Sequence, residues 1–216
     1  ARQPVTRDVC LSKNGICQLD SSVLFTTARG IMRLSGSQTE CVSEAIAHGI
    51  LLDTVQLPYA RKLLAMAFPA ASNNLAERLS VPFRKFLDTC QMTYDYPNQL
   101  VFAFSRNYPY AYVLSLQSGQ WGMTLQSIHY SVNAYPEALV VNSAGELLDL
   151  SKPDVSVNEV PVFMMTRPFT LGHRDLLKTI ETVIMRGVFF NTEIPIALYG
   201  SRDLIHWHLV RTSQKS

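Results

Sequence analysis

The chain has 216 residues, of which 47% are hydrophobic and 17% are charged. This length and apolar fraction are enough to bury a substantial core in one large or two small domains. The formal net charge is only +2 and the positive residues are scattered, which disfavours binding to nucleic acid or a membrane surface by charge. The longest apolar runs fall far short of the ~20 residues of a membrane-spanning helix. We therefore expect neither a membrane partner nor a specific nucleic-acid partner.

The N-terminal part of the chain alternates between short β-prone runs and turn residues. Short strands that recur roughly every ten residues are typical of a sandwich, a barrel or a propeller blade. The predicted strands cover residues 16–19, 23–27, 31–34 and 40–43.

Residues 44–90 have a different character and predict a helical insertion. Pro58 suits a first helical position, and Asn74 with Glu77 resembles a capping box. Pro82 must interrupt or restart the helix. After it, apolar residues follow at helical spacing: Phe83, Phe86, Leu87 and Cys90. We expect this stripe to pack in the core, and contact with a partner subunit is the alternative.

β-patterning returns at Gln91 and continues to about residue 150. The predicted strands cover residues 92–96, 100–104, 111–116 and 121–125, followed by a hairpin of 140–141 and 146–150. Trp121 suits the gap between neighbouring sheets of a propeller. We therefore assign residues 1–150 to a propeller-like β domain that contains the insertion.

Residues 151–216 predict a separate, sandwich-like antiparallel unit. Its strands are expected at 160–166, 179–186, 194–198 and 207–212. The last two flank a turn in which Gly200, Ser201, Asp203 and Trp207 act structurally, with the Asp203 carboxylate bonding turn amides and Trp207 folding over the corner. The fold class is thus mainly β, with antiparallel propeller-like blades, a helical insertion and a C-terminal β unit.

The sequence contains none of the nucleotide-binding, zincin or serine-hydrolase motifs. His206 and His208 share a strand face, but a third metal ligand would have to come from far away in the sequence. A glycoside hydrolase would need two converging carboxylates, and Asp95 and Asp203 are better explained as turn residues. We therefore expect no catalytic residue, no cofactor and no metal.

Two sets of residues have alternative interpretations. Cys10, Cys17, Cys41 and Cys90 lack the spacing of a zinc site, so we expect small buried thiols in a reducing compartment, and a Cys10–Cys17 bridge is the alternative. An aromatic-rich region is expected to supply core and cross-strand pairs, and docking of a sugar or peptide is its alternative. The aromatic set is Tyr94, Tyr96, Tyr108, Tyr110 and Tyr112. The candidate interaction residues are Tyr108, Tyr110 and Trp121.

Several segments, in order along most of the chain, carry a resemblance to a known class. They are Arg7–Cys10, Ser22–Met32, Phe86-Leu87, Tyr94–Tyr96, Tyr112–Leu116, Gly119–Trp121, Thr166–Pro168, Lys178–Ile180, Arg186-Gly187 and Leu198–Leu204. Together they resemble the tail stabilisation or muzzle-type virion proteins of crAss-like and other podovirus-type bacteriophages. The resemblance implies a β-propeller with added β domains that caps or extends the tail and retains the packaged genome.

Those virion proteins are several times longer, and this chain begins with Ala1, so we expect a fragment or a processed product. Ring closure would then need missing sequence or a neighbouring chain, because open sheets leave edges that demand partners. The partners implied are other tail proteins or a homo-oligomeric ring, located in the virion and in the host cytoplasm during assembly. A glycan-binding or glycoside-hydrolase-like propeller fragment and a bacterial cell-surface binding module are the alternatives.

Overall fold

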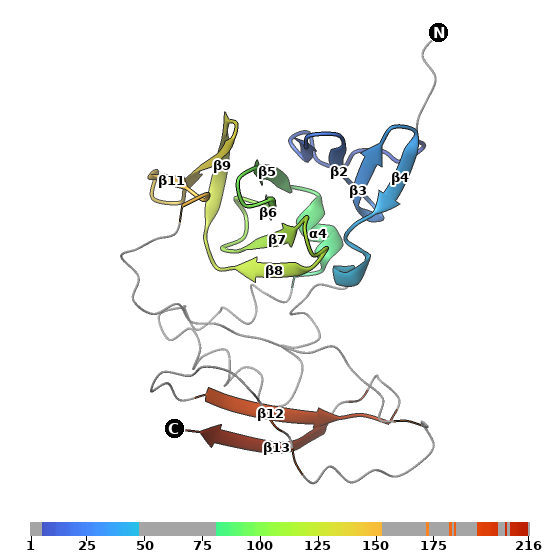
Figure 1. Ribbon diagram of the computed structural model, residues 1–216, viewed down its shortest axis with the longest axis vertical. Coiled ribbons are helices and arrows are strands. Elements are labelled where there is room, and N and C mark those ends of the chain that lie inside the picture. The colour runs from blue at the N-terminus through green and yellow to red at the C-terminus, as the bar shows by residue number, and fades with distance from the viewer. Residues whose placement is uncertain are drawn as a thin grey trace. The chain divides into compact units, whose positions relative to one another are not determined.

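The computed structural model describes residues 6–47, 81–152, 194–202 and 208–215, together with residues 172, 182, 184 and 206. The chain divides into two compact units, one of residues 1–53 and 74–158, the other of residues 54–73 and 159–216. The described elements are mainly β-strands in antiparallel sheets (Figure 1). The strands predicted at 160–166 and 179–186, and the helical signals at Pro58, Asn74 and Glu77, lie outside the described residues.

The first sheet is a four-stranded meander near the N-terminus. Its strands are β1 (Ile16–Gln18), β2 (Val23–Thr27), β3 (Gly30–Ser35) and β4 (Gln38–Cys41), in the order β1-β2-β3-β4. The predicted strands are confirmed, although β4 begins earlier than expected. Ser35 pairs with Gln38, so the turn needs only Gly36 and Ser37. Gly36 has a φ of +60°, which glycine adopts without a steric penalty.

A short helix precedes the second sheet. The helix α4 (Phe83–Leu87) begins directly after Pro82, whose carbonyl oxygen accepts hydrogen bonds from the backbone amides of Lys85 and Phe86. The whole predicted stripe is buried, with Phe86 and Cys90 fully inaccessible. The core interpretation is therefore confirmed for these residues. A 3₁₀ helix at Glu44–Ile46 follows the first sheet.

The second sheet is also a four-stranded antiparallel meander. Its strands are β5 (Gln91–Asp95), β6 (Leu100–Phe104), β7 (Ala111–Ser115) and β8 (Trp121–Thr124), again in chain order. All four were predicted to within two residues. The buried Asp95 carboxylate closes the β5–β6 turn by accepting hydrogen bonds from the backbone and side-chain nitrogens of Asn98, at 3.4 and 2.7 Å.

The third sheet contains a strand that the sequence did not predict. Its order is β11-β10-β9, with β9 (Ile128–Ala134), β10 (Glu137–Asn142) and β11 (Leu147–Asp149). The pairing of β9 with β10 shifts register between Val141 and Asn142, where Ile128 pairs with Asn142 and Tyr130 pairs with Val141. His129 is thus an extra residue, and the bulge turns Ile128 toward the buried face of the sheet.

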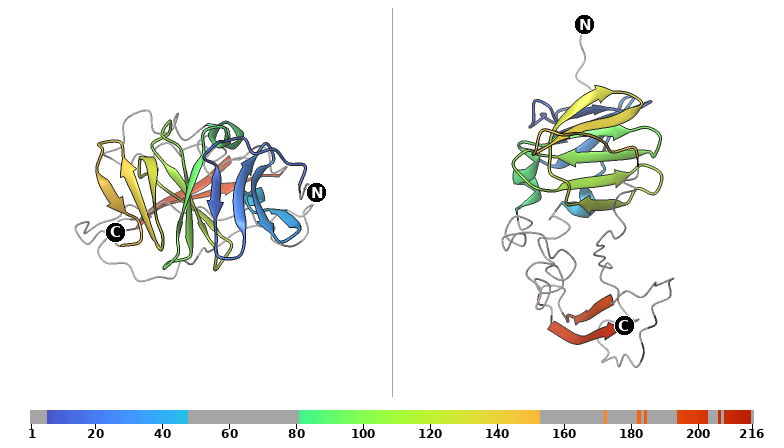
Figure 2. Two further views of the ribbon diagram at one scale, coloured as in Figure 1. Left: turned by 90° about the horizontal axis from the view of Figure 1, so that it is seen from above. Right: turned by 90° about the vertical axis from the view of Figure 1, so that its left-hand side faces the viewer.

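The three sheets lie side by side in chain order within this unit (Figure 2, left). Their first strands are neighbours, because β5 contacts β1 on one side and β9 with β10 on the other. A core cluster of Phe104, Ala111, Ile128 and Val140, with Leu148 and Leu150 against it, joins the second sheet to the third. The described strands close neither a barrel nor a propeller.

In the other unit, β12 (Ile194–Gly200) and β13 (His208–Lys215) form the antiparallel hairpin that was predicted. Gly200 was predicted to be a turn residue, but it is the last residue of β12 and pairs with His208. The pairing reaches Gly200 because the register shifts between Leu198 and Tyr199. A Cβ atom at Gly200 would lie 3.1 Å from the Val210 side chain. Glycine therefore serves close cross-strand packing here.

Candidate functional site

Only part of the structural turn predicted between the last two strands lies among the described residues. Ser201 and Arg202 follow β12 directly, and His206 precedes β13 by two residues. Asp203 and Trp207 lie outside the described residues, so their proposed roles in the turn stay predictions. His206 and His208 are exposed. Within the described ranges, no group of three or more histidine, cysteine, aspartate or glutamate side chains is arranged to hold a metal ion.

Tyr110 is not an interaction residue, because its side chain is fully buried. Its ring stacks on Phe86 of α4, with the ring centroids 5.6 Å apart, and Tyr112 meets the same phenylalanine edge-on at 5.0 Å. Tyr108 also stacks on Phe86, at 5.6 Å, and is half-buried. The helix thus covers Tyr110 and Tyr112, which confirms the expected core packing for these two tyrosines. A sugar cannot stack on Tyr110 in this fold.

The hydroxyl of Tyr110 has no partner of ordinary hydrogen-bond geometry among the described residues. Desolvation raises the pKa of this phenol far above its usual value, and the neighbouring Tyr112 phenol adds to the shift. The group is a neutral part of the core rather than an acid or base poised for reaction near neutral pH.

Trp121 is half-buried and acts as a tie between two sheets. Its Nε1–H donates to the carbonyl oxygen of Val42 at 2.8 Å, which joins β8 to the residue that follows β4. Val42 also lines, with Arg33, Glu40 and residues 114–116, an open cavity of about 230 Å³ between these sheets. The predicted bridging position of Trp121 is therefore confirmed, and its polar atom is already occupied.

Three carboxylates that a glycoside hydrolase could use, Asp95, Glu146 and Asp149, have structural partners. Asp95 closes a turn, and Glu146 accepts a 2.7 Å hydrogen bond from Asn142 within the β10–β11 turn. Asp149 lies 2.7 Å from Lys152. The hydrogen bond from this lysine lowers the pKa of the Asp149 carboxyl, against the opposing effect of desolvation. These carboxylates stabilise turns and ion pairs rather than converging on one point.

The four cysteines are all free thiols, so the alternative Cys10–Cys17 bridge is wrong. Cys17 and Cys90 are buried, as expected, whereas Cys10 and Cys41 are half-buried. Burial raises the pKa of Cys17 to about 11 and raises that of Cys90 further. Neither buried thiol forms an appreciable thiolate near neutral pH, and so neither is a nucleophile there.

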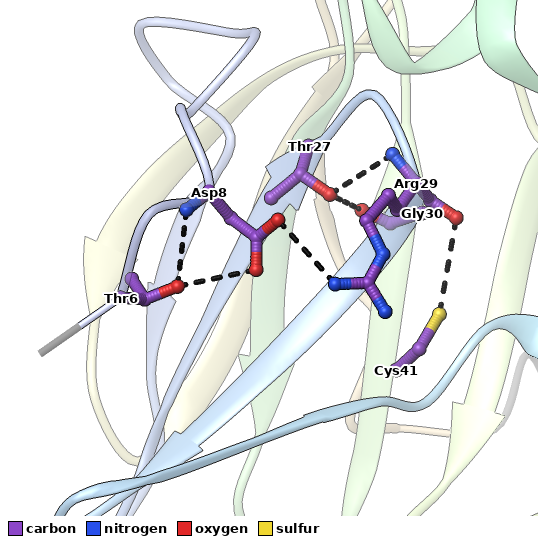
Figure 3. Close-up of polar contacts among 6 residues, drawn as sticks. All are labelled: Thr6, Asp8, Thr27, Arg29, Gly30 and Cys41. Atoms are coloured by element: carbon purple, nitrogen blue, oxygen red, sulfur yellow. Dashed lines mark hydrogen bonds and ion pairs between the residues drawn. The ribbon is translucent and has the colours of Figure 1, made fainter.

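A polar network fixes the N-terminal segment to the β2–β3 turn (Figure 3). Asp8 exchanges hydrogen bonds with Thr6 at 3.1 Å and lies 3.6 Å from the guanidinium of Arg29. Thr27 accepts from the Arg29 amide at 3.2 Å and donates to the Gly30 carbonyl at 3.0 Å. The arginine is 69% exposed, so the ion pair is weak and the network is structural.

The third sheet has one face without a protein partner among the described residues. Residues paired across strands share a face, so Val141 shares a face with Tyr130 and Leu147, and Leu139 shares it with Val132 and Asp149. We call this set the outer face of the third sheet. Three of its members are exposed large apolar side chains: Tyr130 at 52%, Val132 at 40% and Leu147 at 61%. On the opposite face, Ala138 and Val140 are fully buried. We therefore treat the outer face as a candidate interaction surface.

A second feature is a cavity of about 380 Å³ where the three sheets meet. It is lined by Gln18, Leu19, Asp20, Tyr94 and Tyr135, and we call it the tyrosine pocket. The Tyr94 hydroxyl donates to the Asp20 carboxylate at 3.2 Å. No local sequence pattern predicts the tyrosine pocket, because its lining residues come from three separate sheets and share no motif.

The chain matches no protein family model and no curated protein. Across the described residues, no helix combines the length and the apolar character needed to cross a membrane.

Proposed function

We propose that this chain is a non-catalytic structural component, a propeller-like array of β-sheets that works by packing against other chains. The observation that carries the proposal is the outer face of the third sheet. The first sheet packs one face against the second sheet, and the second sheet packs a face against the third. The third sheet ends this series with apolar side chains directed outward, where a further blade of a propeller would pack.

The partner that fits this face best is the first sheet of a second copy. In that sheet, the face with Leu24 and Arg33 is turned to the second sheet, because both line the cavity shared with Leu114. Cross-strand pairing places Ile16 on the opposite face, where it is 55% exposed. Phe25 and Met32 on that face are buried, so Ile16 supplies the exposed apolar contact that we propose at this end of the described array. Contact between unlike ends produces a head-to-tail interface, which closes into a ring or continues as a filament.

The biological setting that we propose is a bacteriophage tail. It rests on the resemblance to tail stabilisation and muzzle-type virion proteins, whose role is to keep the particle closed and the genome inside. Meander sheets joined by short turns suit such a mechanical role, because their backbone hydrogen bonds run between consecutive strands. The other tail proteins are then the further partners of the assembled chain.

The proposed interface is tested by mass measurement in solution with two complementary variants. Wild type should form oligomers whose mass rises with concentration, and Val132→Glu and Ile16→Glu should each prevent this. A mixture of the two variants should form a one-to-one dimer, because each retains the face that the other has lost. Gln120→Glu, in the exposed β7–β8 turn, adds the same charge and should leave assembly unchanged. A strictly monomeric wild type, or a mixture that fails to dimerise, would contradict the proposal.

A further inference from the structure

The tyrosine pocket is built from residues of all three sheets. Gln18 ends β1, Asp20 lies in the β1–β2 turn, Tyr94 lies in β5 and Tyr135 lies in the β9–β10 turn. The backbone amide of Tyr96 donates to the Pro136 carbonyl oxygen at 3.3 Å, which holds the β9–β10 turn against the end of β5. A volume of about 380 Å³ falls within the range of small-molecule sites.

Among the described residues, the single negative charge of the pocket has no counter-ion. Asp20 is the only charged residue in the lining, and none of the ion pairs among the described residues includes it. Burial, and then the hydrogen bond and charge of Asp20, raise the pKa of Tyr94 to about 12. Desolvation, the Tyr96 phenol and the Asp20 charge also raise the pKa of Tyr135. Both phenols therefore stay neutral near pH 7, and both interact electrostatically with the Asp20 carboxylate.

Aromatic rings from the second and third sheets lie beside the Asp20 carboxylate. Tyr94 and Tyr96 meet edge-on with their ring centroids 6.1 Å apart, and Tyr96 lies 5.3 Å from Tyr135 at an interplanar angle of 52°. Tyr135 is 66% exposed, so part of its ring is open to solvent. The negative faces of tyrosine rings attract ammonium and guanidinium groups, and a nearby carboxylate strengthens the attraction.

We propose that the tyrosine pocket binds an organic cation, a quaternary ammonium or guanidinium group, between the Tyr135 ring and the Asp20 carboxylate. A neutral sugar would use the rings but would leave the carboxylate charge uncompensated. The cation is either a free small molecule or a basic side chain of a partner protein, because both present the same chemistry to the pocket. This proposal is tested separately from assembly, since Asp20 and Tyr135, which would hold the cation, lie in turns and not on the two end faces.

Binding is measured by titrating the full chain with choline and with neohexanol, the uncharged carbon isostere of choline. A short arginine-containing peptide and its citrulline counterpart form the second arm. We expect at least one cation to bind at least about 10-fold more tightly than its neutral counterpart. Choline binding alone indicates a small-molecule ligand, and peptide binding alone indicates a basic side chain. Equal binding of cation and neutral counterpart, binding of neutral sugars only, or no binding would overturn the proposal.

Two variants locate the site. Asp20→Asn removes the charge with little change of shape and should weaken cation binding about 10-fold, while Tyr135→Ala should weaken it by about 3- to 10-fold. Tyr130→Ala removes an exposed tyrosine of the same hairpin outside the pocket and should leave binding within about twofold. A shared thermal melting profile confirms that the variants are folded. If Asp20→Asn binds as wild type does, the proposal is wrong. The two wild-type comparisons, choline with neohexanol and the arginine peptide with its citrulline counterpart, decide the question even if a variant does not fold.

Discussion

The indole nitrogen of Trp121 lies 2.8 Å from the carbonyl oxygen of Val42, a residue 79 positions earlier in the chain. This hydrogen bond joins the last strand of the second sheet to the end of the first sheet. At the other side of the second sheet, Tyr94 reaches the β1–β2 turn through Asp20. Hydrogen bonds thus tie both the first and the last strand of the second sheet to the first sheet.

We expect Trp121→Phe to lower the free energy of unfolding by about 1–2 kcal/mol, because it leaves the half-buried Val42 carbonyl without its donor. Urea unfolding monitored by circular dichroism measures the change. Tyr130→Phe alters a ring at an exposed position and serves as the control. Equal midpoints for Trp121→Phe and wild type would show that the bond contributes nothing to stability.

Phe86 is the centre of the aromatic packing under α4, since it contacts Phe83 and three tyrosines. We expect Phe86→Ala to destabilise the fold by about 3–5 kcal/mol, a large share of the stability of an ordinary domain. Thermal melting and the near-ultraviolet signal of the tyrosines report the loss. Arg84→Ala, at an exposed position of the same helix, should have little effect, and a similar loss in both variants would contradict this explanation.

Gly30 and Gly36 provide a matched pair for a test of backbone strain and close packing. Both have positive φ angles, +143° and +60°. A Cβ atom at Gly30 would collide with the Ser43 hydroxyl, which accepts a 2.8 Å hydrogen bond from the Ile31 amide, whereas nothing lies near one at Gly36. We expect Gly30→Ala to cost about 3 kcal/mol and Gly36→Ala about 1 kcal/mol. Chemical denaturation of both variants measures the difference, and equal losses would show that the collision is relieved.

Buried phenols make the fold sensitive to alkaline pH. Desolvation, above all other causes, raises the pKa of Tyr112 to about 12, whereas a phenol in the unfolded chain titrates near 10. Above about pH 10 the unfolded state binds fewer protons than the folded state, so the free energy of unfolding falls as pH rises. For Tyr112 alone the loss approaches about 3 kcal/mol by full ionisation.

Unfolding measured across the range from about pH 9 to 12 should therefore show a steep decline, together with the late appearance of tyrosinate absorbance. Tyr112→Phe removes one of the raised groups and should make the decline shallower. Tyrosinate forming near pH 10 for all tyrosines in an intact fold would contradict the expectation.

The strands of the first two sheets are predictable because turn residues separate compact apolar runs. Val23–Thr27 and Leu100–Phe104 match their predictions at both ends, since Asp20–Ser22 and Pro97–Gln99 leave no room for a shift. The strand β9 was missed because polar residues interrupt Ile128–Ala134 and the bulge at His129 breaks the alternation of faces. A pattern based on period two does not detect such a strand.

The burial of Tyr110 and the two candidate sites were harder to predict for a different reason. Tyr110 lies in a sequence rich in turn signals, and only its contact with Phe86 of α4 reveals that it is buried. The tyrosine pocket combines residues as distant as Gln18 and Tyr135, which meet through the packing of sheets and not through any local pattern. The outer face of the third sheet depends on the pairing register of β9 with β10. Tertiary packing, rather than composition, determines all three.

The meander order of the described sheets also bears on how the chain acquires its structure. In the first two sheets each strand pairs with the strand just before or after it, so the pairing partners are close in sequence. Chains dominated by such short-range pairings reach the native state faster than chains that must join remote strands. During synthesis, the first sheet can form before the second has left the ribosome. The hydrogen bonds of Trp121 and Tyr94 then form late, between sheets that have already folded.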